Sequence, residues 1–298
     1  MAIADSVGRP PESFTGEVRE LVDCRPDDAT PQEPAEGAHG WDVARIVERA
    51  LPEAEYDFHH SLNEPGENSD EFDVDDLIPP IDAAVRNSVD VLNMSAGVDS
   101  KYGAHRSYER VVRRAAESGT TVVAAAGNEN KVDRLAYPAR APAAICVAGC
   151  ISRCRRRRID EHLRDRRLWV HEPSFRDGPY CSARGCHRRT DCTSQEHRWW
   201  HGNVEPMGYK PDVSASAVHF TGHETPPIRE GTSFSTPLIT GALGRLVGET
   251  DGRVPTGEAL AQLIRRNSKF LGADLAPQAD HNRQQFAMSE IRNALDET

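Results

Sequence analysis

Four short apolar runs, each bounded by polar residues, stand out along the chain. They are MAIADS (1–6), VDVLNMSAG (89–97), TTVVAAAGN (120–128) and AAICVAG (143–149). Their nearly continuous apolar character predicts strands that are buried on both faces, rather than strands with one face in water. Strands of this kind are typical of a parallel sheet that is covered by helices on either side.

Helical patterns separate these runs at residues 39–51, 75–88 and 106–118. The first of them repeats apolar residues on one helical face, at Val43, Ile46, Val47 and Leu51. Two more helices are predicted, one after residue 237 that ends at about 248 and one over 255–267. Strands alternating with helices predict an α/β fold of three layers, with a doubly wound and mostly parallel sheet. Sites in such sheets lie at the carboxyl ends of the strands.

Two segments interrupt this alternation. Residues 57–75 are acidic and polar and are predicted to form a surface loop, which would include His59 and His60. Residues 150–205 hold 13 arginines against eight acidic residues, together with five of the seven cysteines. We therefore predict an α/β domain made of residues 1–149 and 206–298, with a small inserted module at 150–205 that is rich in Cys and Arg.

Composition and charge describe the surface of the protein. The 298 residues are 38% hydrophobic and 28% charged, with a formal net charge of −11, and only four of the 36 basic residues are lysines. An acidic surface with little Lys predicts a halophilic protein, whose carboxylates hold water at high salt; a GC-rich genome that favours Arg codons is the alternative. No run approaches the roughly 20 apolar residues of a membrane span.

The first residues, MAIADSVGRPPES, have neither the basic start nor the long apolar run of a secretory signal. We therefore expect a cytoplasmic protein. A secreted protein is the alternative, if the natural N-terminus lies further upstream.

Candidate catalytic side chains stand at the ends of predicted strands and at the starts of predicted helices. Asp5 ends the first strand, Asn128 ends the third, His39 opens a helix, and Ser233 lies in GTSFSTP just before another helix. A nucleophilic Ser needs a base within reach, a group that orients the base, and donors for the developing oxyanion. These residue types can fill all of those roles. The alternative for Ser233 is a helix cap, and Asp23 is a competing carboxylate for Asp5.

Seven segments resemble the motifs of the subtilisin-like serine proteases, the subtilases. They are IADS, HGWDVARI, VLNMSAG, VVAAAGN, YPARAPAAICVAG, YKPDVSA and GTSFSTPLITG. The order Asp, His, Ser along the chain is that of subtilisin. The resemblance covers most of residues 1–149 and 206–248. It implies a subtilisin-like fold and a serine endopeptidase that cuts peptide or protein substrates through an acyl-enzyme. It implies no cofactor for catalysis and leaves calcium open.

The resemblance also implies the role of each residue in the site. Ser233 would be the nucleophile, His39 the general base and then the general acid, and Asp5 the group that orients His39. The backbone N–H of Ser233 and the side chain of Asn128 would form the oxyanion hole. Gly231 would let the backbone approach the substrate, and Pro237 would lie near the first helical turn, where a missing N–H costs little.

The resemblance further implies where a substrate would bind. Ser95, Ala96 and Gly97 would pair with the substrate backbone as an added strand. The segment 124–127, which includes Ala126 and Gly127, would line the pocket for the residue before the scissile bond.

Two features depart from the family pattern. Asp42 stands where the family has a second His, three residues after the first, and a carboxylate there could raise the His39 pKa or disturb its geometry. Little sequence precedes Asp5, so we expect either a protein that folds without the family's usual prodomain, as some intracellular relatives do, or a natural start further upstream. These departures support the alternative hypothesis of a catalytically silent subtilase that acts as a binding module. A further alternative is a partner-gated subtilase, in which the inserted module at 150–205 controls access to the site.

The cysteines of the inserted module are spaced for a metal. Cys150, Cys154, Cys181 and Cys186 could supply four thiolates to a structural Zn²⁺, with Cys192 or His187 as a substitute ligand. Disulfides are the alternative, and an extracellular protein would favour them.

The same module contains the run CRRRRID. Consecutive arginines can contact phosphates, but acidic residues follow at once and the whole protein is acidic. We expect a docking surface for a protein partner rather than for nucleic acid.

Overall fold

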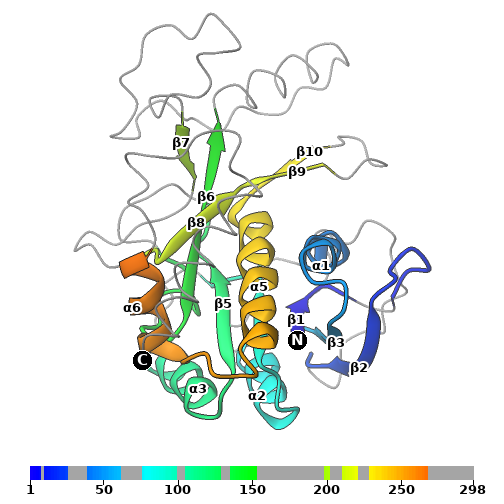
Figure 1. Cartoon of the computed structure of the whole chain (residues 1–298), viewed down its shortest axis with the longest axis horizontal. Coiled ribbons are helices and arrows are strands. Elements are labelled where there is room, and N and C mark those ends of the chain that lie inside the picture. The colour runs from blue at the N-terminus through cyan, green and yellow to red at the C-terminus, as the bar shows by residue number, and fades with distance from the viewer. Residues whose placement is uncertain are drawn as a thin grey trace, which may run out of the picture.

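A mostly parallel sheet runs through the centre of the molecule, with helices on both of its faces (Figure 1). The computed structural model describes residues 1–7, 10–25, 39–61, 76–98, 105–128, 135–152, 198–201, 210–220 and 228–267. The strands of the sheet are β1 (Ala2–Asp5), β2 (Glu17–Asp23), β3 (Glu55–His60), β4 (Val91–Met94), β5 (Thr121–Ala125), β6 (Ile145–Ser152), β7 (Arg198–His201) and β8 (Val213–Ser216).

Seven of these strands are parallel neighbours in the order β2-β3-β1-β4-β5-β6-β8, and β7 is antiparallel to β6. The order reverses direction beside β1, because β3 lies on one side of it and β4 on the other. Doubly wound sheets form their functional crevice at such a switch point. The carboxyl ends of β1 and β4 therefore mark the expected position of a site.

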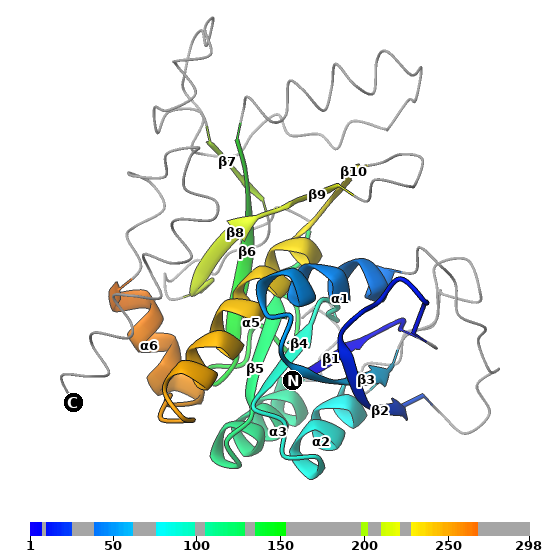
Figure 2. The ribbon, with the colours of Figure 1, turned by 45° about the vertical axis from the view of Figure 1, so that its right-hand side comes forward.

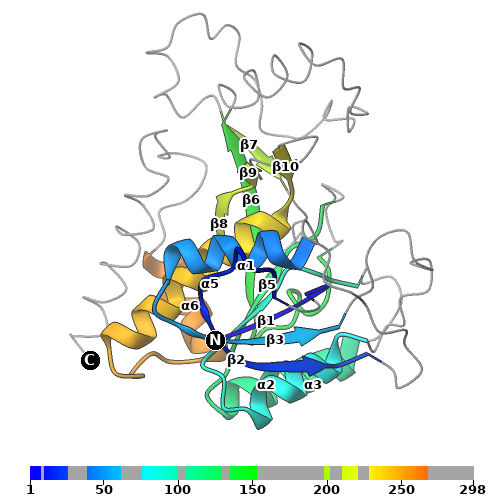
Figure 3. The ribbon, with the colours of Figure 1, turned by 90° about the vertical axis from the view of Figure 1, so that its right-hand side faces the viewer.

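Five helices of the described residues cover the sheet. They are α1 (His39–Ala50), α2 (Ile78–Arg86), α3 (His105–Glu117), α5 (Thr232–Glu249) and α6 (Gly257–Asn267). Figures 2 and 3 show α2 and α3 on one face, and α1, α5 and α6 on the other. The predicted fold class, a three-layer α/β architecture with a doubly wound and mostly parallel sheet, is confirmed.

Alternating side chains of the central strands fill two separate layers of core. In β4, Leu92 and Met94 pack with residues of α2 and α3, while Val91 packs with residues of α5 and α6. Each of these side chains is at most 1% exposed. Burial on both faces explains why the sequence of this strand reads as a continuous apolar run.

The predicted surface loop at residues 57–75 is wrong at its start. Glu55–His60 forms β3, between β1 and β2, and residues 62–75 lie outside the described part of the chain. His59 and His60 are therefore buried strand residues. Asp57 is buried as well, because its carboxylate accepts two hydrogen bonds from the Arg19 guanidinium. Such pairing is what allows a charged residue to occupy a central layer.

The predicted boundary at residues 149 and 150 falls inside a strand. β6 continues to Ser152, and β7, which belongs to the predicted inserted module, pairs with its last four residues. Both ends of that module thus join the sheet, while residues 153–197 lie outside the described part of the chain. A short antiparallel hairpin of β9 (Val218–Phe220) and β10 (Ile228–Glu230) leads from the sheet into α5.

Candidate active site

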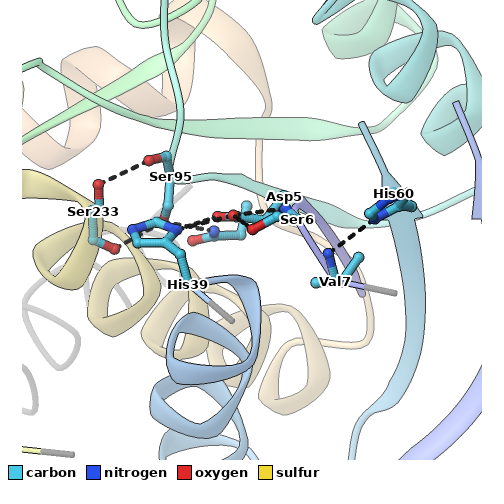
Figure 4. A network of polar contacts seen from close by, with 8 residues as sticks. Asp5, Ser6, Val7, His39, His60, Ser95 and Ser233 are labelled. Carbon is cyan, nitrogen blue, oxygen red and sulfur yellow. Dashed lines mark hydrogen bonds and ion pairs between the residues drawn. The ribbon is translucent and has the colours of Figure 1, made fainter. Parts of the chain in front are cut away.

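Several polar side chains that are distant in sequence meet at the carboxyl edge of the sheet. Asp5 is the last residue of β1, Ser95 follows β4, and Asn128 comes three residues after β5. The N-terminal ends of α1 and α5 bring His39 and Ser233 to the same edge. Figure 4 shows the His39 imidazole between the Asp5 carboxylate and Ser233.

His39 and Asp5 form a close pair. The Nδ1 atom of His39 lies 2.9 Å and 3.1 Å from the two carboxylate oxygens of Asp5. The Asp5 side chain is 1% exposed, whereas that of His39 is 27% exposed. The Asp5 carboxylate also accepts a hydrogen bond from the backbone N–H of Ser6 (2.8 Å). An anion at Nδ1 fixes the proton there, so Nε2 is left as the basic nitrogen.

The residue after His39 has to be small. A Cβ on Gly40 would lie 2.8 Å from the Ser6 carbonyl oxygen, 3.0 Å from the Asp5 Cβ and 2.5 Å from a methyl group of Val7. The first turn of α1 therefore touches the end of β1 directly. This close approach brings the His39 ring to Asp5.

The two carboxylates that made the site uncertain at the sequence level lie elsewhere. Asp23 forms an ion pair with Arg25 (2.7 Å), and its side chain is 57% exposed. Asp42 is buried on α1, and its carboxylate lies 3.8 Å from the Arg45 guanidinium. His39 keeps both of its contacts with Asp5 beside this carboxylate, and an effect of Asp42 on the pKa of His39 stays a prediction.

Ser233 is the second residue of α5, and the helix begins directly after Gly231. The positive end of the helix dipole and the free N–H groups of the first turn favour negative charge at this position. The Ser233 hydroxyl donates a hydrogen bond to the Ser95 carbonyl oxygen (2.9 Å). Its neighbour Phe234 lies against the His39 ring, with ring centroids 5.5 Å apart. Ser233 and His39 therefore belong to one site.

Pro237 is the sixth residue of α5 rather than part of its first turn, so its predicted place was slightly wrong. The missing N–H at this position is one that an α-helix would use.

Asn128 is oriented by the residue before Ser233. Its side-chain oxygen accepts hydrogen bonds from the backbone N–H (2.9 Å) and the hydroxyl (3.0 Å) of Thr232. Because the oxygen is engaged in this way, the amide nitrogen is the group that can donate to a bound molecule. The Asn128 amide also lies 3.5 Å from the position that a Cβ on Gly231 would occupy. The hydrogen bonds from Thr232 therefore hold the Asn128 amide nitrogen beside the backbone of Ser233.

The segments predicted to bind substrate lie next to this cluster. Ser95, Ala96 and Gly97 follow β4, and Val98 then forms an isolated antiparallel bridge with Tyr137. A Cβ on Gly97 would lie 2.7 Å from that of Ala136, so the chain is tightly packed here. Ala126 is fully buried, and Gly127 has a positive φ of 97°. Their contact with a substrate remains a prediction.

Sequence reasoning missed two polar residues beneath the site. Asn93 and Thr240 are fully buried, and the Thr240 hydroxyl donates a hydrogen bond to the Asn93 side-chain oxygen (2.8 Å). The signal was an Asn inside an otherwise apolar strand, which predicts a buried hydrogen-bonded partner. Nothing in the sequence identified that partner.

Two buried histidines lie next to the end of β1. The Nδ1 atom of His60 accepts a hydrogen bond from the Val7 N–H (3.2 Å), and that of His59 donates one to the Pro80 carbonyl oxygen (3.0 Å). Burial lowers the pKa of both rings below the ordinary value of 6.5, and for His60 the nearby Arg25 adds to this effect. Both histidines therefore disfavour the charged form, and their rings stabilise the strand through hydrogen bonds to neighbouring backbone groups.

The predicted zinc ligands cannot be placed as a set. The backbone of Cys150 pairs with Trp200 and Ser216 in the sheet. Cys154, Cys181, Cys186, Cys192 and His187 lie outside the described residues. Within the residues that the structure describes, no group of three or more His, Cys, Asp or Glu side chains could hold a metal ion. The zinc site therefore remains a prediction.

The fold and this cluster define a class of protein, the serine hydrolases built on a doubly wound α/β sheet. The sequence matches the model of the subtilase family over residues 15–287, so the chain belongs to the subtilase family of proteases. The match begins after Asp5, so the family model does not cover this residue, and its contact with His39 is seen in the structure. No curated protein sequence matches the chain.

Solved structures of proteases share the fold. The patellamide maturation protease PatA superposes with a TM-score of 0.61 at 20% identity, covering 99% of this chain and 96% of PatA. A lanthipeptide protease gives 0.62 at 14% identity, covering 97% and 86%. A cold-adapted subtilisin-like serine proteinase gives 0.57 at 18% identity, covering 90% and 81%. At these identities the likeness establishes the subtilisin-like fold.

Proposed function

We propose that the chain is a serine endopeptidase that hydrolyses peptide bonds through an Asp5–His39–Ser233 triad. The observation that carries this proposal is the pair formed by His39 Nδ1 and the Asp5 carboxylate (2.9 Å), with Ser233 on the other side of the imidazole (Figure 4). Three segments that are far apart in sequence meet there. A base held in one tautomer, next to a hydroxyl at a helix N-terminus, is the arrangement that nucleophilic catalysis by Ser needs.

The reaction follows from these positions. Ser233 Oγ attacks the scissile carbonyl carbon while His39 Nε2 takes the hydroxyl proton, and the imidazolium is stabilised by Asp5. The oxyanion accepts hydrogen bonds from the Ser233 N–H and the Asn128 amide nitrogen. His39 then returns the proton to the leaving amine, which leaves an acyl-enzyme on Ser233. Water, deprotonated by His39, attacks the ester and releases the acid, and Ser233 recovers its proton.

The proposed substrate is an extended peptide or a flexible segment of a protein. Its backbone would pair with Ser95, Ala96 and Gly97, which continue the chain beyond the end of β4 and would offer main-chain donors and acceptors to an added strand. Ala126 and Gly127 would form one wall of the pocket for the residue before the cut.

None of the helices among the described residues has the length and apolar character to cross a membrane.

Hydrolysis of an internally quenched peptide library tests the proposal. Wild-type protein and Ser233→Ala would be compared at low and high KCl, since the acidic composition predicts activity that rises with salt. Cleavage by the wild type alone supports the proposal. A folded wild-type protein that cleaves nothing in any salt favours the silent or partner-gated alternative.

We also propose that the inserted module holds a structural Zn²⁺ through Cys150, Cys154, Cys181 and Cys186. The spacing of these residues supports a thiolate site, and a small module whose sequence shows little apolar periodicity would need such a link. Metal analysis of the purified chain tests it. About one zinc per chain that is lost in a variant with two of these cysteines replaced by Ser supports the site, and a metal-free chain contradicts it.

A further inference from the structure

The carbonyl group of Ser233 lacks its ordinary helix partner. In an α-helix the carbonyl of residue i accepts a hydrogen bond from the N–H of residue i+4, which for Ser233 is residue 237. That residue is Pro237, inside α5, and proline has no N–H to donate. A backbone carbonyl left without any partner in a protein interior costs free energy. Another donor is therefore needed at the residue that carries the reactive hydroxyl.

The Ser95 hydroxyl supplies that donor. It donates a hydrogen bond of 2.8 Å to the Ser233 carbonyl oxygen, across a sequence separation of 138 residues. In return, the Ser233 hydroxyl donates to the Ser95 carbonyl (2.9 Å), so the two serines hold each other through both side chains (Figure 4). The backbone and the side chain of Ser233 are thus both tied to the end of β4.

The Ser95 hydroxyl is itself oriented from below. The Asn93 amide nitrogen donates to the Ser95 oxygen (3.0 Å), and the Thr240 hydroxyl donates to the Asn93 oxygen (2.8 Å). The Thr240 hydroxyl also lies 3.0 Å from the Thr236 carbonyl oxygen, so its single proton is shared between two acceptors. Asn93 and Thr240 are fully buried, and Ser95 is 4% exposed. Each residue of this series donates a hydrogen bond to the next, from Thr240 through Asn93 and Ser95 to the Ser233 carbonyl. In a hydrogen-bond network of this kind each bond polarises the next.

We propose that the Ser95 hydroxyl, held by Asn93, replaces the helix hydrogen bond that Pro237 cannot donate, and thereby positions the nucleophile. This inference rests on the proposed function of Ser233. Ser95 and Asn93 are positioning residues here, since their side chains act through the Ser233 peptide. That peptide also carries the N–H proposed for the oxyanion, so loss of the Ser95 bond would change transition-state stabilisation more than substrate binding.

The test combines Ser95→Ala with Pro237→Ala. Ser95→Ala is expected to lower kcat about tenfold or more, with KM changed less than about twofold, because a buried hydrogen bond at the reacting residue is lost. Pro237→Ala in the same chain restores an N–H that reaches the Ser233 carbonyl, and is expected to recover most of the lost kcat. Ser95→Thr keeps the hydroxyl and is expected to lose less kcat than Ser95→Ala.

Two control variants separate positioning from general stability. Gly248→Ala lies on α5 with no atom within 4 Å of the added methyl group, so it stabilises the same helix but is not expected to rescue Ser95→Ala. Thr250→Val removes another buried hydroxyl, which donates to the Leu246 carbonyl (2.7 Å) at the far end of α5. It is expected to lower the unfolding temperature and leave kcat unchanged.

Several results would overturn the inference. An unchanged kcat in Ser95→Ala contradicts it, and so does a folded double variant with no more activity than Ser95→Ala. If Ser95→Ala alone does not fold, the double variant must fold and hydrolyse peptide, and its failure to do so counts against the inference. A wild-type chain that hydrolyses nothing is a different outcome, because it refutes the proposed function itself.

Discussion

His39 contacts both carboxylate oxygens of Asp5 through a single ring nitrogen, at 2.9 Å and 3.1 Å. The contact joins the first strand of the chain to the first helix and leaves the opposite ring nitrogen toward Ser233. A carboxylate in this position fixes the tautomer of the base and stabilises its charged form. The identity of this carboxylate is the part of the site that the sequence left open between Asp5 and Asp23.

Replacing Asp5 is therefore expected to abolish most of the activity. Asp5→Asn keeps the shape of the side chain but favours the wrong tautomer of His39, so kcat is expected to fall about 10⁴-fold with little change in KM. Asp23→Asn is the matched control, since the exposed carboxylate of Asp23 pairs with Arg25 rather than with His39. Steady-state hydrolysis by the two variants distinguishes them. Loss of activity in Asp23→Asn with full activity in Asp5→Asn contradicts the assignment.

Asn128 is expected to act in the transition state. Asn128→Ala removes the proposed oxyanion donor and is expected to lower kcat by about 10²–10³-fold without a comparable rise in KM. Thr232→Val should cause a smaller loss, because the Asn128 oxygen keeps the backbone N–H of Thr232 and loses only the hydroxyl. Thr232→Ser serves as the control that keeps the hydroxyl. Equal kcat values for Asn128→Ala and wild type exclude this role.

Gly40 is expected to be sensitive to a single methyl group. The added Cβ of Gly40→Ala would lie 2.8 Å from the Ser6 carbonyl oxygen, so α1 has to move away from β1 and His39 away from Asp5. We expect a loss of about 1–3 kcal/mol in the free energy of unfolding together with reduced kcat. Gly248→Ala on α5 has open space and is expected to be neutral or slightly stabilising. Urea unfolding and hydrolysis rates measure both effects, and identical results for the two variants contradict the packing argument.

The buried histidines predict acid sensitivity. Burial lowers the pKa of His59 and His60 in the folded chain below the unfolded value of about 6.5. Below that pH the unfolded chain takes up protons that the folded chain excludes, so the free energy of unfolding falls as the pH drops from about 6.5 toward the folded pKa values. Stability is unaffected by these groups at higher pH, where both states are neutral.

Urea unfolding at pH 7.5 and pH 5.0 measures this effect. His59→Asn and His60→Asn remove the titrating groups and are expected to reduce the loss of stability between the two pH values. The pKa values of Asp23 and Asp57 are lowered by their arginine partners, so both carboxylates stay ionised between pH 5.0 and pH 7.5 and do not contribute in this range. A wild-type protein equally stable at both pH values contradicts the prediction.

The central strands and the helices could be predicted from the sequence, because burial on both faces leaves an apolar run that pattern analysis detects. β2, with the sequence EVRELVD, could not, since it is an edge strand whose residues are largely exposed. β3 was mistaken for a loop because Asp57, His59 and His60 look polar. Their burial depends on partners elsewhere in the chain, such as Arg19 and the Pro80 carbonyl.

The site residues were predicted because their types stand at strand ends and helix starts and because their motifs resemble a family. The hydrogen bonds that hold these residues in place could not be predicted. The hydrogen bond between Thr240 and Asn93 joins residues 147 positions apart and exists only because α5 crosses β4. The role of Ser95 likewise depends on a proline in the sixth position of a helix that the sequence alone did not place beside it.

Labelling with a fluorophosphonate probe, followed by peptide mapping, tests the central claim most directly. We expect one adduct per chain on Ser233, at a rate that rises with salt, with no adduct in Ser233→Ala and a greatly slowed one in His39→Ala. A folded wild-type protein that forms no adduct at low or high salt, or that forms its adduct on another residue, contradicts the claim that Asp5, His39 and Ser233 work as a catalytic triad.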